Sequence, residues 1–321
     1  MHLLTKIKRK ILVSPPVRFL VRGSKRWCLP GFQGIPLFDT IRFFFQQARK
    51  TGFSERASAI AFNFTMAIPP AIIFLFTLVP YIPISQEFID EMYRLIRDVV
   101  PGEENNSGLI VFLNTILNKP RTGLLSTGFL LAMFFSSNAI MGIMRSFDKN
   151  YIGFRKRKGL QQRWTALRLT GVLFILFFIT ITALVMQGAV LRWLGVKNAT
   201  LIAIIHNLRW VVILLLVFFC VSFIYRYAPA VHKKWKLISP GSILATALMI
   251  VFTGAFSYYV SRFSNYNELY GSISTVLILM LLIFFNSLVL LIGFELNVSI
   301  NSLKHEVDER NKLHTAGSHP A

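Results

Sequence analysis

Six stretches of the chain contain no Asp, Glu, Lys, Arg or His and are long enough, or nearly so, to cross a bilayer. They are residues 57–86, 122–144, 169–191, 210–225, 239–261 and 269–294. About 20 helical residues cover a hydrocarbon core of roughly 30 Å. The fourth stretch is short, but the flanking Arg209 and Arg226 can extend their charged ends to the membrane surface. The sequence therefore predicts an all-α, polytopic membrane protein with six transmembrane helices.

The basic residues are distributed unevenly between these stretches. Of the 35 Lys and Arg residues, 27 lie before the first stretch, in the connections 145–168 and 226–238, and in the tail. Loops rich in Lys and Arg stay in the cytoplasm, so both termini are expected there. A net charge of +21 would also suit nucleic acid. Because the charge lies between apolar stretches, we expect membrane lipids as partners and no nucleic acid; homo-oligomerisation is left open.

Residues 1–56 form a basic cytoplasmic segment with two amphipathic patterns. One consists of Leu3, Leu4, Ile7 and Ile11, and the other of Leu37, Phe38, Ile41, Phe44, Phe45 and Ala48. Charge recurs before any long apolar stretch, which argues against a signal peptide. Both patterns predict interfacial helices lying on anionic headgroups. For the second helix, packing against the cytoplasmic ends of the bundle is an equal alternative.

The remaining chain divides into a membrane domain and a tail. The transmembrane domain covers residues 57–300 and contains one large outer loop, 83–121, with an amphipathic helix predicted over 86–100. Residues 107–118 are mostly apolar but too short to span, so they lie at the outer interface or enter the membrane partway. The charged tail, residues 301–321, is predicted to be a disordered cytoplasmic segment.

The first span contains Pro69 and Pro70 near its middle. Two prolines remove two amide donors, so a kink or a break is expected. Broken helices expose backbone to substrate in several transporters. The alternative is a simple kink packed against neighbouring helices.

Three amides lie within apolar stretches and are candidates for a shared substrate cavity: Asn63, Asn138 and Asn286. An unpartnered amide costs several kcal/mol in lipid, so mutual convergence would satisfy all three. Ser137, beside Asn138, is grouped with them. The competing interpretation is that each amide bonds a neighbouring helix or backbone separately.

Charged groups near the span ends have structural and functional alternatives. Glu268 and Tyr270, in the short connection before the last span, are further cavity candidates. Glu268 suits proton or cation coupling if it is partly buried, or else a solvated or structural role. Glu295 and Arg226 lie near the inner interface, where an ion pair between them would satisfy two costly groups.

Several motifs resemble the YihY/BrkB family of bacterial inner-membrane proteins, once labelled ribonuclease BN. They are Ala57-Ser-Ala-Ile-Ala61, Ser136-Ser137, Arg145, Asn150-Tyr151, Tyr225-Arg-Tyr-Ala-Pro229, Tyr270-Gly-Ser272 and Gly293-Phe-Glu-Leu-Asn297. The resemblance covers roughly residues 35 to 300 and depends on the order of the motifs over six spans. It implies a permease or flippase-like protein for a lipid or another amphiphile. The alternative is a non-transporting membrane scaffold or envelope-maintenance protein.

Enzymatic activity is not expected from the residues themselves. The two cysteines, Cys28 and Cys220, lack metal-ligand spacing, and the six histidines are scattered. A metal-dependent nuclease needs clustered ligands around an activated water. No GxxxxGK[ST] phosphate loop is present, so any coupling would use a gradient or a partner. We therefore expect no metal and no cofactor.

The predicted topology is testable with single introduced cysteines in intact cells. We expect an impermeant thiol reagent to label a cysteine at Asn105, because the connection 83–121 faces outward in this topology. Labelling at Lys156 would contradict it.

Overall fold

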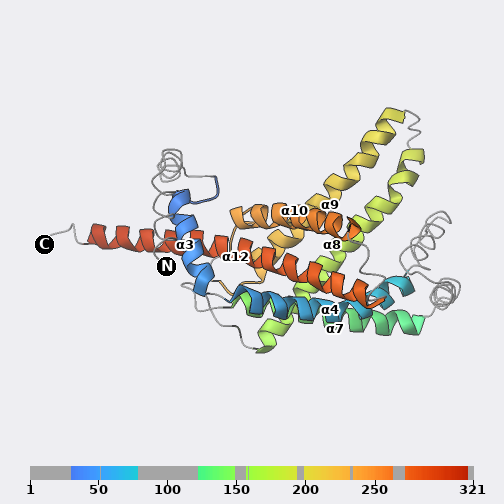
Figure 1. Cartoon of the computed structure of the whole chain (residues 1–321), viewed down its shortest axis with the longest axis horizontal. Coiled ribbons are helices and arrows are strands. Elements are labelled where there is room, and N and C mark those ends of the chain that lie inside the picture. The colour runs from blue at the N-terminus through green and yellow to red at the C-terminus, as the bar shows by residue number, and fades with distance from the viewer. Residues whose placement is uncertain are drawn as a thin grey trace.

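The structure is a computed structural model, and it describes residues 30–50, 52–78, 122–148, 157, 159–193, 199–231, 234–262 and 272–316. Across these ranges the regular elements are α-helices, and no strand is present. Figure 1 shows α3 (Leu37–Lys50), α4 (Phe53–Leu78), α7 (Thr122–Phe147), α8 (Gly159–Trp193), α9 (Ala199–Tyr227), α10 (Pro240–Arg262) and α12 (Ser272–Ala316). All but α3 contain a stretch long and apolar enough to cross a membrane. The predicted all-α fold with six spans is confirmed.

The six spans form a closed ring in which chain order is also spatial order. α4 packs on α7, α7 on α8, α8 on α9, α9 on α10 and α10 on α12, and α12 returns to contact α4. One end of this ring, which we call the basic end, is where α4, α8 and α10 begin and α7 and α9 end. In Figure 1 the opposite ends of α8 and α9 lean away from the other helices.

The outer surface of the ring is apolar. Leu130 on α7, Ile175 on α8 and Val251 on α10 are 63%, 62% and 67% exposed. Burying such side chains is worth about 1.5–3 kcal/mol each, and a soluble monomer rarely exposes contiguous apolar surface on this scale. Contact with lipid acyl chains accounts for these faces, which is what a membrane protein of six spans requires.

The helices α10 and α12 approach each other closely at Gly241 and Gly293. A Cβ atom placed on Gly293 would be 2.7 Å from the Ala245 Cβ and 2.5 Å from the Gly241 carbonyl oxygen. Only small residues permit this distance between backbones. The Asn297 side chain reinforces the contact, because its Oδ1 accepts from the Gly241 N–H at 2.9 Å and its Nδ2 donates to Ser239 Oγ at 2.9 Å.

The break predicted at Pro69 and Pro70 is wrong, because α4 is continuous from Phe53 to Leu78 through both prolines. Each proline removes only its own amide donor, and the flanking turns keep their backbone bonds. Packing of α4 along α7 supports the helix over this length. A kink at this position stays a prediction.

The tail prediction is wrong for residues 301–316, which continue α12 as helix. Two (i, i+4) pairs support this extension: Lys304 with Asp308 at 2.8 Å, and His305 with Glu309 at 3.4 Å. Hydropathy identifies where a helix can cross lipid, and it does not report where the helix ends beyond the membrane.

The second amphipathic helix is confirmed as α3, and it packs on α12. Thr40 is buried in this contact, whereas Ile41 and Phe45 are exposed. The packing alternative therefore describes one face of α3, and lipid contact by the exposed apolar residues stays a prediction. The first amphipathic pattern and the predicted elements of the loop 83–121 lie outside the described residues.

We expect Gly293→Ala to destabilise the protein by about 1–3 kcal/mol, because the added methyl group overpacks the α10–α12 crossing. Gly254→Ala in α10 is the matched control, since a Cβ there meets no atom within 4 Å. Helix propensity alone favours alanine over glycine by about 1 kcal/mol. Thermal unfolding in detergent measures both variants. Equal stability of the two would contradict the close crossing.

Candidate functional site

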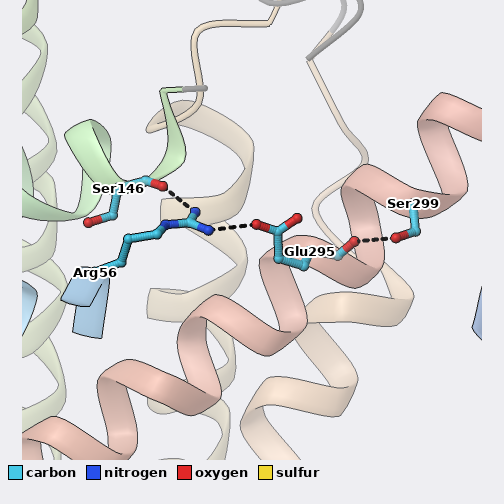
Figure 2. A network of polar contacts seen from close by, with 4 residues as sticks. All are labelled: Arg56, Ser146, Glu295 and Ser299. Atoms are coloured by element: carbon cyan, nitrogen blue, oxygen red, sulfur yellow. Dashed lines mark hydrogen bonds and ion pairs between the residues drawn. The ribbon is translucent and has the colours of Figure 1, made fainter. Parts of the chain in front are cut away.

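A buried ion pair at the basic end joins the first and last spans (Figure 2). Arg56 Nη1 lies 2.7 Å from Glu295 Oε1, and the two side chains are 10% and 0% exposed. Arg56 also donates from Nη2 to the carbonyl oxygen of Ser146, in the last turn of α7. The guanidinium therefore links α4, α7 and α12 at one point. Within α12, Ser299 Oγ donates to the Glu295 carbonyl at 2.8 Å.

The surroundings of this pair are aromatic. The rings of Phe147 and Phe294 stack with centroids 3.8 Å apart and an interplanar angle of 4°. Trp235 lies 5.6 Å from the Phe294 ring, and Tyr225 lies 6.4 Å from it. The Tyr225 hydroxyl donates to the Leu290 carbonyl at 2.6 Å, so this buried polar group is satisfied. Close packing of these rings keeps water from the ion pair and raises the cost of breaking it.

A second arginine caps α9 at the same end. Arg157 donates to the carbonyl oxygens of Ala228 at 2.7 Å, Pro229 at 3.1 Å and Tyr227 at 3.3 Å. A cation on the terminal carbonyls of a helix satisfies their unused acceptors and complements the helix dipole. Near this cap, burial raises the pKa of the Asp148 carboxyl above its usual range, against the opposing effects of Arg157 and the Ala230 amide.

The spans also line a half-open apolar cavity of about 380 Å³ between α4, α7, α8 and α9. Most of its lining residues are aromatic or aliphatic, among them Phe74, Leu75, Ile140, Leu173, Phe174 and Phe178. The Phe74 ring stacks on Phe174 at 6.5 Å and meets Phe178 edge-on at 5.9 Å. The few polar atoms include Thr170 Oγ1, which is already bonded to Ala166 O in its own helix at 2.9 Å. The cavity can accept an apolar group and has little to offer a polar one.

The predicted convergence of three amides is wrong, because each contacts a different neighbour. Asn63 Nδ2 donates to its own Ala59 carbonyl at 2.7 Å and lies against Gly142 of α7. Asn138 accepts from Arg163 of α8. Asn286 donates to Leu282 O at 3.0 Å and to Thr253 Oγ1 of α10 at 3.3 Å. A carbonyl four residues earlier satisfies an asparagine in a helix, so no common partner is needed. None of the three lines the apolar cavity.

The other predicted site residues do not lie together in one site. Ser137 is buried and donates to the Phe134 carbonyl of its own helix at 2.8 Å. Glu295 was expected to pair with Arg226, but the cation that the structure brings to it is Arg56. The Arg226 guanidinium instead lies 5.5 Å from the Tyr227 ring centroid. Pro69 and Pro70 do not line the apolar cavity, and Glu268 and Tyr270 lie outside the described residues.

Sequence reasoning missed Arg56, Arg157 and Asn297. Arg56 was counted only among the topology-setting cations, although it directly precedes the first span. The sequence did contain a signal for such a cation, because a buried Glu295 requires a positively charged partner at the same depth. The sequence alone did not show that α4, and not α9, would bring that cation.

The fold and the buried polar network define a six-span helical membrane protein with a tightly packed basic end. The chain matches the family described as Virulence factor BrkB over residues 44–318. It therefore belongs to that family, and the resemblance noted in the sequence is confirmed.

Three relatives show the extent of similarity. The ribonuclease-like protein YfkH of Bacillus subtilis is 27% identical over 259 residues, covering 79% of this chain and 92% of YfkH. A UPF0761 membrane protein of Xanthomonas campestris is 30% identical over 89 residues, which are 28% of this chain and 21% of that protein. One from Stenotrophomonas maltophilia is 29% identical over 93 residues, which are 29% and 22% of the two chains. No solved structure matches.

We expect Arg56→Gln and Glu295→Gln each to destabilise the protein by about 3–5 kcal/mol, because each removes one partner of a buried ion pair. The double variant should lose less than the sum of the two single losses. Asp308→Asn, which breaks the exposed pair with Lys304 in the same helix, is the control and should change stability by less than about 1 kcal/mol. Denaturant or thermal unfolding in detergent measures all four; fully additive losses would show that the pair is not coupled.

Proposed function

We propose that this protein moves a lipid or another amphiphile across a bacterial inner membrane and does so without enzymatic chemistry. The observation that carries the proposal is the apolar cavity of about 380 Å³ within the span region. Ligand sites in proteins have volumes of about 300–1,000 Å³ and are mostly apolar. The lining of the cavity suits an acyl chain better than a sugar or an ion.

The arrangement of the helices supports the same function. The cavity lies between the α4–α7 pair and the α8–α9 hairpin, whose far ends lean away in Figure 1. The basic end is held by the Arg56–Glu295 pair and the α10–α12 crossing. A lipid tail can enter between helices that diverge toward one side while the bundle stays closed at the other. We also propose that the basic end faces the cytoplasm, with both termini on that side.

The names of the relatives do not define a substrate. YfkH carries the description ribonuclease-like, and the two UPF0761 proteins are described only as membrane proteins. Among the described residues, no group of three or more His, Cys, Asp or Glu is arranged to hold a metal ion. Transport of an amphiphile is therefore argued from the cavity and not from the relatives.

The test is transbilayer movement of fluorescent phospholipids in vesicles that contain the purified protein. We expect movement faster than in protein-free vesicles, and Ala71→Trp should slow it severalfold because the indole fills the cavity. Ala255→Trp is the matched control, since Ala255 lies on the exposed face of α10 and outside the cavity. Wild-type protein with no movement above background would contradict the proposal and favour the scaffold alternative. Equal slowing by both tryptophans would show that the cavity is not the path.

A further inference from the structure

A second cavity, of about 410 Å³, lies at the basic end and shares Trp235, Ser239 and Asn297 with the contacts described above. Three separate parts of the chain form it: the loop before α3, the segment between α9 and α10, and α12. Its lining consists of Gly31, Gln33, Lys234, Trp235, Lys236, Ile238, Ser239, Pro240, Asn297, Ile300 and Asn301. Among the residues that the structure describes, two lysines line it and no carboxylate does. We call it the lysine cavity.

The walls of the lysine cavity are held in place by their own contacts. Gly31, with φ +92°, brings the loop so close to α10 that an added Cβ would lie 3.0 Å from Pro240 Cγ. Gln33 has a left-handed φ of 54°, and its Nε2 donates to Asn301 Oδ1 at 3.3 Å. Trp235 is buried against the Phe294 ring. The cavity is therefore preformed and does not need to be assembled around a ligand.

The positive charge of the cavity comes from its lysines and not from the start of α10. The first amides of that helix already have partners: Gly241 N donates to Asn297 Oδ1 at 2.9 Å, and Ser242 N donates to Ser239 Oγ at 3.2 Å. Lys234 and Lys236 have no acidic partner within the part of the chain that the structure describes. The Lys234 Nζ lies 4.8 Å from the Tyr227 ring centroid, which steadies the side chain without neutralising it.

The lysine cavity lies where a transmembrane helix begins, because Pro240 is both the first residue of α10 and part of the lining. This places it at the level of lipid headgroups, where anionic groups are concentrated and where tryptophan side chains such as Trp235 are favoured. Two lysines that line one cavity suit an anion that accepts several hydrogen bonds. A phosphate group has that chemistry, and lysine is a common phosphate ligand.

We propose that the lysine cavity binds a phosphate group, carried either by a lipid headgroup or by a soluble phosphate compound. Lys234 and Lys236 contact the phosphate oxygens, and the rest of the cavity holds the group to which the phosphate is attached. This site is separate from the apolar cavity, and phosphate binding there does not require that the protein transports anything.

The experiment measures the ligand-dependent rise in thermal stability of the purified full chain in neutral detergent. The probes are phosphatidic acid, glycerol 3-phosphate, inorganic phosphate and, as a phosphate-free lipid, diacylglycerol. We expect phosphatidic acid to stabilise the wild type and diacylglycerol not to do so. Stabilisation by phosphatidic acid alone identifies a lipid headgroup as the ligand, whereas stabilisation by glycerol 3-phosphate or inorganic phosphate as well identifies a soluble phosphate.

Variants test whether the binding depends on this cavity. Lys234→Gln with Lys236→Gln should weaken the apparent affinity by about tenfold or more, whereas Lys234→Arg with Lys236→Arg should retain binding. The matched control is Arg42→Gln with Lys304→Gln, which removes the same charge from residues that do not line the cavity. Ile238→Glu introduces a carboxylate at a lining position that is 66% exposed, so it should weaken binding without disturbing the fold.

Three results would overturn the proposal. They are an unchanged affinity in the glutamine double variant, an equal loss in the Arg42 and Lys304 control, and equal stabilisation by diacylglycerol. If the glutamine double variant does not fold, Ile238→Glu decides, and unchanged binding in that variant overturns the proposal. Because these measurements use no transbilayer movement, their failure is distinguishable from failure of the proposed transport.

Discussion

The ion pair between Arg56 and Glu295 closes the ring of spans. Each of the other ring contacts joins helices that follow one another along the chain, whereas α12 must return to α4 across the whole sequence. Glu295 is fully buried, and an unpaired carboxylate at such a position costs several kcal/mol. The meeting of the first and last spans therefore supplies a cation for this charge. The same guanidinium bonds the Ser146 carbonyl, so the end of α7 is fixed by the closure as well.

Much of the fold follows from the bilayer, and the sequence predicts that part well. Backbone in lipid must bond internally, so six long apolar stretches become six helices. The continuation of α12 to Ala316 cannot be predicted from the bilayer, because it is supported by ion pairs in a polar segment. The continuity of α4 through Pro69 and Pro70 cannot be predicted in this way either, because the effect of a proline depends on the packing of its helix.

The candidate site was less predictable because side-chain partners depend on ring order. The sequence shows that Glu295 needs a cation, but Arg56 and Arg226 both lie near the same end, and only the α4–α12 contact selects between them. The prediction that Asn63, Asn138 and Asn286 meet is wrong because each amide has its own partner. Asn63 and Asn286 donate to carbonyls of their own helices, and Asn138 accepts from Arg163 of α8. The apolar cavity had no sequence signal, since Phe and Leu look the same whether they face a cavity, a core or lipid.

The two ends of the bundle differ in how firmly their helices are held together. At the basic end, polar and aromatic contacts fix the helices: the buried ion pair, the Gly241–Gly293 crossing and the Arg157 cap on α9. Toward the other end the α8–α9 hairpin diverges from the other helices (Figure 1). The apolar cavity lies between this hairpin and the α4–α7 pair. The lysine cavity belongs to the fixed end, where its lining includes the first residue of α10. An amphiphile has one apolar part and one polar part, and these two cavities offer a separate environment for each kind of chemistry.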